Sequence, residues 1–331
     1  MTYASDVSVP AVAFVADRLG LPGNPLAAAR VLQRKDIFRA LQRDMGLPHP
    51  PFAAGADPEV LAAAVGREGV PFPVLVKPAD SSGSKGQMLA PDPTVLPAAF
   101  AHARPFSRCG VVVAESVLAR GLPELDGDAL VQSGRLVFAH YGHNYFAVPG
   151  PVWVPVGETF PGFFGGAVIG ELDRQLQAIV DRLGVRTGCL NFDGLVSSGA
   201  VHLLEVALRN GGYLVPDAIQ LSTGFDLRRA AVLAACGIDV PVPHLHAPDP
   251  QPAMTYAIQT ARSGVLRGIR LDPAIAPHVV RQDLFVEPGG VVRPYTRGDY
   301  LVGMLLLRPP DAGTLRRLMD EIPRYVTVDV D

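Results

Sequence analysis

Two carboxylates that face each other across a predicted β-hairpin are the residues best placed to do chemistry in this sequence. Strand patterns at 190–196 (LNFDGLV) and 201–208 (VHLLEVAL) flank the small residues SSGA, a hairpin signal. If the loop centres on Gly199, Asp193 lies directly opposite Glu205. Opposed carboxylates repel each other, and a divalent cation such as Mg²⁺, which prefers hard oxygen ligands, reverses that penalty. The pattern therefore predicts a metal site, with a pair of solvated surface acids as the alternative.

The same alternation assigns the hairpin side chains to two faces. The core face carries the apolar residues Leu190, Phe192, Val196, Leu204, Val206 and Leu208. The other face carries Asn191 and Arg209 together with the two acids. An arginine beside carboxylates favours a site that handles phosphate or carboxylate groups. Gly211 and Gly212 follow, and glycines let backbone amides approach a substrate closely.

A second stretch, VLVKPADSSGSKG at 74–86, joins a buried strand to a loop of small residues. Pro78 cannot donate to a sheet ladder, so the chain leaves the sheet just after Lys77. The loop could present backbone N–H groups, hydroxyls and the Lys85 ammonium to phosphate oxygens. The P-loop pattern is absent, as is a G-x-G-x-x-G after a strand. A phosphate cradle and a solvated surface turn both remain open from this stretch alone.

Lysine is rare in the chain: only Lys35, Lys77 and Lys85 occur among the 29 basic residues. A lysine retained in an arginine-rich sequence suggests a need for a compact, flexible ammonium group, with chance as the alternative.

Composition limits the function classes. The 331 residues are 48% hydrophobic, enough for a large core in two or three lobes, and the net charge is −3. Without a basic block, we expect neither a nucleic acid nor a membrane surface as partner. Apolar runs are too short to span a bilayer, and the N-terminus lacks a signal-peptide pattern. Three cysteines without a CxxC pattern suggest a cytoplasmic protein.

The predicted elements favour an α+β organisation, because helices and strands are mixed rather than strictly alternating. Helices are expected at 25–45, 58–67, 171–183, 225–236 and 313–321, and strands at 72–77, 110–115, 129–131, 135–140 and 325–330. A Gly/Pro-rich meander covers 120–170. The pair His244 and His246 lacks further ligands at zinc spacing, so no metal is expected there.

Taken in order, these motifs resemble the ATP-grasp superfamily, in particular carboxylate–amine ligases of the L-amino-acid ligase type, over roughly 19–237. The resemblance rests on GLPGNPLAAARVLQRKDIFRALQRDMGLPHP, VLVKPADSSGSKG, VVVAESVLARGLPEL and NFDGLV…HLLEVALRNGG. It implies the ATP-grasp fold, with two α+β lobes that sandwich the nucleotide and a C-terminal β-rich subdomain. The implied divisions are 1–50 (remnant of an N-terminal domain plus the first helix), 51–118 (small lobe), 119–245 (large lobe) and 246–331 (β-rich part).

The resemblance also implies roles for individual residues. ATP would contact Lys35, Lys77, the flap residues Ser84, Lys85 and Gly86, the hinge residues Glu115, Ser116, Val117 and Leu118 at the adenine edge, and Glu124 at the ribose. Asp193 and Glu205 would hold Mg²⁺, or Mn²⁺ in its place. Arg209, Gly211 and Gly212 would bind substrate, and Arg209, Lys85 and Ser84 would assist catalysis.

Two features depart from the family pattern. The usual Glu-x-Asn-x-Arg becomes Glu205-Val-Ala207-Leu-Arg209 here. Asn191, opposite Ala207 in the hairpin, is expected to take over part of the missing ligand's role. The second departure is that only some 25 residues precede the first helix, so the N-terminal domain looks truncated. The substrate site is then more open, or a homodimer or partner subunit completes it.

The expected activity is an ATP-dependent ligase that joins a carboxylate and an amine, from amino acids or similar metabolites, through an acyl phosphate. Carboxylation through carboxyphosphate is one alternative, and bicarbonate-dependent ADP release would reveal it. A non-catalytic ATP-binding subunit is the other, favoured by Ala207 and the short N-terminus.

Overall fold

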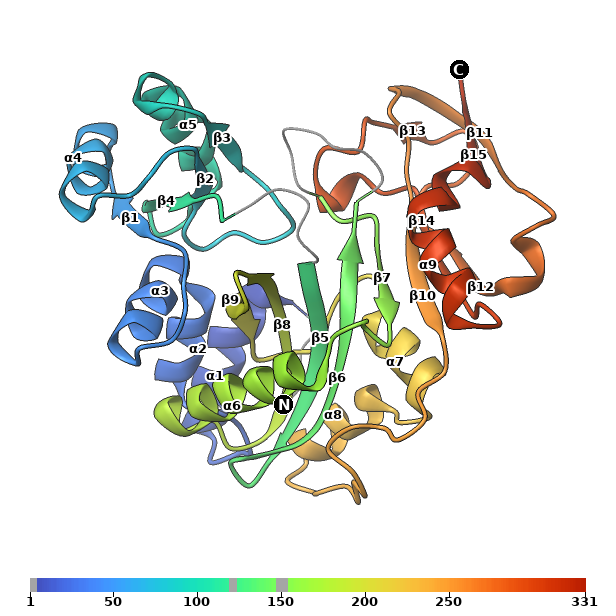
Figure 1. Ribbon diagram of the computed structural model, residues 1–331, viewed down its shortest axis with the longest axis horizontal. Coiled ribbons are helices and arrows are strands. Elements are labelled where there is room, and N and C mark those ends of the chain that lie inside the picture. Colours follow the sequence, from blue (N-terminus) through green and yellow to red (C-terminus); the bar gives the residue numbers. More distant parts are fainter. Residues whose placement is uncertain (1–4, 119–123, 147–153) are drawn as a thin grey trace.

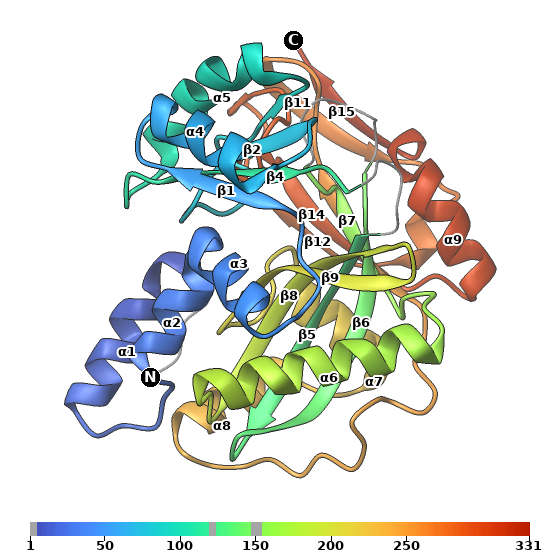
Figure 2. The same ribbon diagram turned by 60° about the vertical axis from the view of Figure 1, so that its left-hand side comes forward.

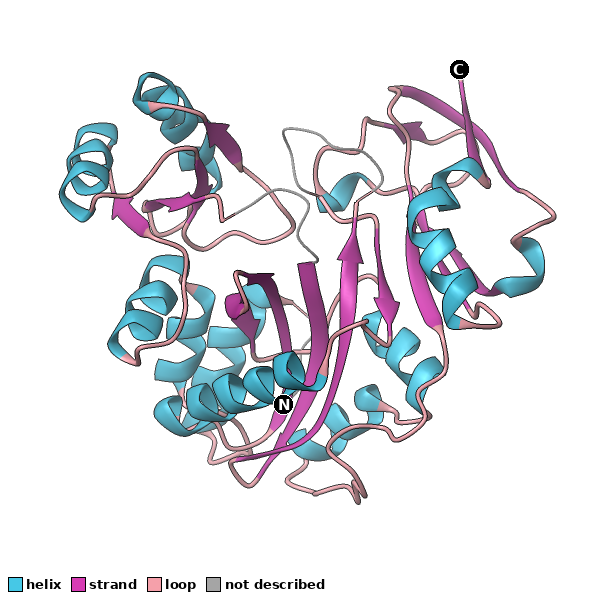
Figure 3. Cartoon of the chain, in the orientation of Figure 1, coloured by secondary structure: helices cyan, strands magenta, loops and turns pink. Residues whose placement is uncertain are grey.

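A computed structural model describes residues 5–118, 124–146 and 154–331 of the chain (Figure 1). A small lobe, a large central sheet and a C-terminal β-rich part surround a common centre, with helices packed on the outside of the sheets (Figure 3). None of the described helices is long and apolar enough to cross a bilayer. The mixed α and β elements confirm the predicted fold class.

The small lobe is a four-stranded sheet with the strand order β1-β4-β2-β3. Its strands are β1 (Phe52–Gly55), β2 (Val74–Pro78), β3 (Met88–Ala90) and β4 (Val112–Ser116). Helices α4 (Pro58–Glu68) and α5 (Leu96–Ala103) lie on the side of this sheet turned away from the large sheet (Figure 2). Their apolar residues, among them Leu61 and Phe100, form one core with Val74 and Val76 of β2.

The large sheet has eight strands in the order β12-β14-β10-β7-β6-β5-β8-β9, and every adjacent pair is antiparallel. Its strands are β5 (Glu124–Gln132), β6 (Arg135–Tyr145), β7 (Gly157–Phe160), β8 (Gly188–Ser197), β9 (Ala200–Ala207), β10 (Ala253–Ile258), β12 (Val279–Leu284) and β14 (Gly303–Leu307). A three-stranded sheet of β13 (Val291–Val292), β11 (Gly264–Leu271) and β15 (Val326–Val330) completes the β-rich part.

Helices cover the large sheet unevenly. The remaining helices are α1 (Val9–Arg18), α2 (Leu26–Gln33), α3 (Lys35–Asp44), α6 (Gly166–Leu183), α7 (Val215–Thr223), α8 (Leu227–Ala235) and α9 (Ala312–Glu321). Helix α6 packs on the face of β5 that carries Leu125, whereas α7 and α8 pack on the opposite face around Leu130. By strand alternation, that second face also carries Glu124, Asp126 and Asp128 towards the other end of β5.

The single helix predicted at 25–45 is wrong, because the chain breaks into α2 and α3 at Arg34. Arg34 has extended backbone angles, with φ of −107° and ψ of 107°. The Lys35 N–H donates to the carbonyl oxygen of Ala79 at 2.8 Å instead of to a preceding helical turn. This tertiary bond places Lys35 at the first position of α3, next to the loop that follows β2.

The hairpin pairing of Asp193 with Glu205 is confirmed, as is that of Asn191 with Ala207. The turn residues Ser198 and Gly199 both have positive φ, 51° and 79°, which suits a two-residue hairpin turn. That turn alone would shift the pairing by one residue, but a bulge in β9 restores it.

The bulge makes the prediction for Leu204 wrong. Leu203, not Leu204, is buried in the core, and Leu204 lines the central cavity. The extra residue interrupts the strict alternation on which the predicted face assignment rested.

Most other predicted elements are found with shifts of a few residues, but the helices α1, α5 and α7 were missed. The residues before α7, Tyr213 and Leu214, have positive φ, and Pro216 lies in the first turn of that helix. In the meander, β5 and β6 are longer than predicted, and parts of it, 120–123 and 147–153, lie outside the described residues. The predicted domain boundaries stay a prediction.

A buried arginine links α3 to both lobes. Arg39 is 0% exposed, and its Nε lies 3.0 Å from Glu115 Oε1 on β4. Its Nη2 donates to the carbonyl oxygen of Leu204 on β9 at 2.6 Å, and its Nη1 donates to Gln42 Oε1 at 2.8 Å. One side chain thus connects the small sheet, the bulge of the large sheet and the helix between them.

We predict that Arg39→Leu lowers the free energy of unfolding by about 3–5 kcal/mol, because the Glu115 carboxylate would lose a buried partner. Urea denaturation followed by circular dichroism measures this. Arg43→Leu on the same helix is the control, since Arg43 is half exposed and its ion pair with Glu68 lies at the surface. Equal losses in the two variants would contradict the linking role of Arg39.

Candidate active site

A cavity of about 1600 Å³ lies between the small sheet and the large sheet, and the C-terminal part closes a further side. It gathers residues from all parts of the chain: Lys77 and Glu115 come from the small lobe, Asp193 and Glu205 from the large sheet. Every residue predicted for the site lines this cavity except Gly86 and Gly211. Motifs that are far apart in the sequence therefore meet at one place.

One end of the cavity carries the lysines. Lys77 Nζ lies 2.5 Å from Glu115 Oε2. Burial lowers the pKa of Lys77, and the charge of Glu115 opposes that shift. Burial alone would raise the pKa of Glu115, but Arg39 and Lys77 hold that pKa below its ordinary value. Lys77 and Glu115 thus form a buried ion pair at the wall of the cavity.

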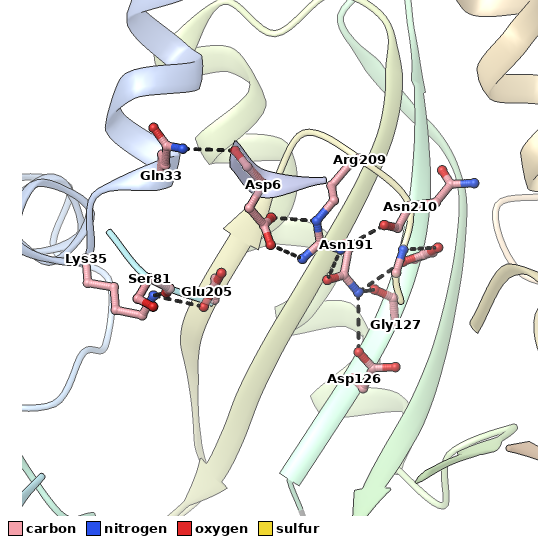
Figure 4. Close-up of polar contacts among 12 residues, drawn as sticks. Asp6, Gln33, Lys35, Ser81, Asp126, Gly127, Asn191, Glu205, Arg209 and Asn210 are labelled. Carbon is pink, nitrogen blue, oxygen red and sulfur yellow. Dashed lines mark hydrogen bonds and ion pairs between the residues drawn. The ribbon is translucent and has the colours of Figure 1, made fainter. Parts of the chain in front are cut away.

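Lys35 reaches the site from the start of α3. Its Nζ donates to the Ser81 carbonyl oxygen at 2.7 Å and lies 3.3 Å from Glu205 Oε2 (Figure 4). The side chain thus connects the loop after β2 with one carboxylate of the predicted metal pair.

The loop after β2 is built into the fold at both ends. The Asp80 carboxylate accepts bonds from Ser107 Oγ at 3.0 Å and from the Cys109 N–H at 2.9 Å. At the tip, the Gly298 N–H donates to the Gly83 carbonyl oxygen at 3.1 Å. Gly86 has a φ of 73°, and a Cβ there would lie 2.6 Å from the Phe106 ring. These contacts favour the phosphate-cradle alternative over a solvated turn, because they turn the loop towards the cavity.

At the predicted hinge, two backbone donors are already used. The Ser116 N–H donates to the Pro51 carbonyl oxygen at 2.9 Å, and the Val117 N–H donates to that of Pro73 at 3.0 Å. Both residues line the cavity together with Leu118. Backbone contacts to an adenine from this segment would come from its other groups.

Three carboxylates stand in a row across neighbouring strands of the large sheet. Asp126 on β5 pairs with Asp193 on β8, which pairs with Glu205 on β9. Asp126 Oδ2 is buried and has no hydrogen-bond partner in the described part of the chain. Burial raises the pKa of Asp193 to about 6, and the charge of Glu205 adds to the shift. Carboxylates this close together repel one another, and a bound cation would stabilise the row.

The donor set fits Mg²⁺ that arrives with a nucleotide. Within the described part of the chain, no group of three or more His, Cys, Asp or Glu is arranged to hold a metal ion by itself. Mg²⁺ is usually bound through one or two carboxylates together with substrate phosphates. Asp193 and Glu205 supply two facing carboxylates beside the lysine end of the cavity.

Asn191 and Arg209 are engaged with other residues. Asn191 Oδ1 accepts a bond from Arg209 Nη1 at 3.0 Å, and its Nδ2 donates to Asp128 Oδ1 at 3.1 Å (Figure 4). Asn191 Oδ1 would have to exchange Arg209 for a metal ion to act as a ligand, and that role stays a prediction. Arg209 also forms a two-point ion pair with Asp6, at 2.5 and 3.0 Å.

Gly211 contributes to packing in this structure. Its N–H donates to the carboxylate of Asp128 at 2.9 Å, and a Cβ there would lie 2.8 Å from Val215. Burial raises the pKa of Asp128 to about 7, although the bond from Gly211 opposes the shift. Gly212, by contrast, lines the cavity.

Sequence reasoning missed several residues that line the cavity: Asp6, Asp126, His143, Asn144 and Glu158. One signal was present. ELDGD at 124–128 places acids at every second position, so a strand would carry three carboxylates on one face. Asp6 and Glu158 carried no such signal, because only the tertiary fold brings them to the site.

Comparisons with known proteins give partial matches in sequence. Carnosine synthase 1 from Gallus gallus is 28% identical over 300 residues, which cover 80% of this chain and 30% of that protein. A formate-dependent phosphoribosylglycinamide formyltransferase from Methylococcus capsulatus is 36% identical over 103 residues, 31% of this chain and 24% of that protein. The chain thus spans less than a third of either protein. The formate-dependent phosphoribosylglycinamide formyltransferase from Azotobacter vinelandii is 25% identical over 310 residues, which cover 92% of this chain and 73% of that protein. No family model matches the sequence.

Solved structures match over 99% of this chain. L-amino acid ligase from Bacillus licheniformis has a TM-score of 0.79 at 18% identity, with 79% of that chain covered. Phosphoribosylglycinamide synthetase from Anaerococcus prevotii has a TM-score of 0.72 at 16% identity, with 81% of that chain covered. Biotin carboxylase from Campylobacter jejuni has a TM-score of 0.74 at 14% identity, with 74% of that chain covered. The chain has the ATP-grasp fold that these solved structures share.

Proposed function

We propose that the protein is an ATP- and Mg²⁺-dependent ligase that joins a carboxylate to an amine through an acyl phosphate. The observation that carries this proposal is the meeting of Lys35, Lys77 and Lys85 with the opposed acids Asp193 and Glu205 in one cavity. Lysines neutralise phosphates as compact charges, and opposed acids accept a divalent cation. Together they supply the charge neutralisation that phosphoryl transfer requires.

In this proposal the chain mainly positions groups and balances charge. Lys35, Lys77 and the loop residues Ser84, Lys85 and Gly86 bind the ATP phosphates. Bound Mg²⁺, held by Asp193 and Glu205, would neutralise the charge that develops on the phosphates. The segment 115–118 holds the adenine.

Glu124 is proposed to bind the ribose hydroxyls. Burial raises the pKa of Glu124 to about 8, and the charge of Asp193 adds to the shift. A protonated carboxyl group can donate a hydrogen bond as well as accept one.

The acid substrate is proposed to bind at Arg209. Its carboxylate attacks the γ-phosphorus of ATP and ADP leaves, which forms the acyl phosphate. An amine then attacks the acyl carbon, phosphate leaves, and the amine loses its proton. Gly212 allows close approach of the substrate to the backbone. Similarity to carnosine synthase 1 and to an L-amino acid ligase supports amino acids or amino-acid-like metabolites as substrates.

The main test is an ADP-release screen over pairs of amino acids with hydroxylamine added to trap an acyl phosphate as a hydroxamate. Hydroxamate formation supports the ligase. ADP release that requires bicarbonate would instead support carboxylation, which the likeness to biotin carboxylase keeps as the second candidate. ATP binding without ADP formation from any pair or from bicarbonate would favour a non-catalytic subunit.

We predict that Glu205→Gln lowers the rate of ADP release at least about 100-fold, because the cation would lose one of two facing carboxylates. The thermal midpoint should stay near the wild-type value, since Glu205 is only partly buried. Glu171→Gln, a partly buried acid on α6 that pairs with Arg174, is the matched control. Undiminished turnover in Glu205→Gln would remove the metal assignment.

We predict that Asp6→Asn lowers the KM for the acid substrate, because the Asp6 carboxylate competes for Arg209 in this structure. Steady-state kinetics with the acid varied at saturating ATP measures the change, and the KM for ATP serves as the internal control. A higher KM for the acid would show that Asp6 orients Arg209 for the substrate instead.

We predict that stabilisation by Mg²⁺ and ATP grows as the pH rises through about 6, where Asp193 loses its proton in the folded protein. The folded state holds this proton more tightly than the unfolded chain does. The ligand-free protein should therefore lose stability as its buried acids ionise. Thermal midpoints measured with and without ligand across this pH range test both trends. Asp193→Asn should abolish the pH dependence of the ligand effect, and a constant effect in the wild type would contradict the prediction.

A further inference from the structure

The cavity extends well beyond the predicted metal pair. From Glu205 on β9 and Asp193 on β8, it continues over β5, β6 and β7 to Met304 of β14 and Met319 of α9. The lysines lie at the β9 end, where Lys35 pairs with Glu205. The ribose is proposed at Glu124, the first residue of β5, so the space over the rest of β5 and over β6 and β7 is the part left for a substrate.

This part of the wall is acidic. Asp126 on β5 and Glu158 on β7 line it and are 3% and 4% exposed. Among the described residues, neither carboxylate has an ion pair with a lysine, arginine or histidine. Asp126 Oδ2 has no hydrogen-bond partner at all, and Glu158 accepts a bond from the Thr255 hydroxyl.

Nearby basic side chains do not compensate these acids. Burial lowers the pKa of His143 to about 4, and its Nε2 accepts a bond from the Phe163 N–H at 2.9 Å. His143 is therefore neutral at physiological pH. Arg316 is exposed and lies over the Phe163 ring at 4.1 Å.

Asn144 of β6 lies beside Glu158 and two residues along its strand from Gly142, the cross-strand partner of Asp126. It pairs with Glu124 of β5 on one side and with Glu158 of β7 on the other. Its Nδ2 donates to Asp193 Oδ1 at 3.3 Å, which leaves the amide oxygen as an acceptor. A carboxylate oxygen, an amide oxygen and a second carboxylate thus line one stretch of wall.

We propose that Asp126, Asn144 and Glu158 form the subsite for the primary ammonium group of the amine substrate. An ammonium group has three N–H donors and no acceptor, so it matches a wall of two carboxyl groups and an amide oxygen, and its charge would favour the ionised form of those carboxyl groups. A second metal ion fits less well, since the described residues contain no group of three ligands placed for one. The inference rests on the proposed ligase function, because it assigns the second substrate of that reaction.

The binding test uses the full-length protein with ethanolamine, an ammonium ion at neutral pH, and ethylene glycol, its neutral counterpart. Saturation-transfer NMR should detect ethanolamine and not ethylene glycol. Glu158→Gln and Asp126→Asn should each lose that signal, because each replaces a carboxyl group that can ionise against the ammonium by a neutral amide of the same shape. Asp320→Asn is the matched control, since Asp320 also lines the cavity but is exposed on α9. Equal signals for both probes, or retention of the ethanolamine signal in both charge variants, would overturn the subsite.

The kinetic test compares two nucleophiles with the same acid and ATP: ethanolamine, and hydroxylamine, which is largely uncharged at neutral pH. We expect Glu158→Gln to lower the rate with ethanolamine relative to hydroxylamine about 10- to 100-fold. Asp320→Asn should leave that ratio unchanged. Parallel loss with both nucleophiles, or a changed Mg²⁺ requirement, would overturn the assignment in favour of a structural or metal role. Absence of ADP and hydroxamate in the wild type would refute the ligase, while the binding test would still decide on the subsite.

Discussion

The buried guanidinium of Arg39 is the interaction on which the arrangement of the lobes depends. It neutralises Glu115, which in turn holds Lys77 at the lysine end of the cavity. The same side chain binds the carbonyl oxygen of Leu204 at the bulge of β9. A buried charge cannot be left unpaired without a large penalty, so these partners hold one another in place. The positions of the small lobe and the carboxylate strands are thereby coupled through one side chain.

Around this link, charge is separated along the cavity. Lysines gather where β2 and α3 meet the end of the large sheet, whereas carboxylates occupy β5, β7 and β8. Such separation stores repulsion on the acidic side, seen in the raised pKa values of Asp193 and Glu158. Cationic and anionic ligands together would relieve it, and the cavity is thus matched to a reaction that brings both kinds of group.

Local patterns in the sequence predicted the parts of the fold and site that depend on local rules. The facing pair of Asp193 and Glu205 was predicted from strand alternation and a loop centred on Gly199, but the two-residue turn reaches that pairing only through the bulge in β9. The break at Arg34 was not, since a bond between Lys35 and the distant Ala79 produces it. Asp6 reaches Arg209 across some two hundred residues, and no local pattern reveals such a contact.

The bulge at Leu204 has a consequence for how this hairpin tolerates change. Strand pairs next to the turn, such as Ser197 with Ala200, share one register. The pair of Asp193 and Glu205 belongs to a second register, because Leu204 is an extra residue between the two. Backbone irregularities of this kind absorb small displacements locally. A change in the length or conformation of the exposed tip can therefore leave the alignment of the two acids intact.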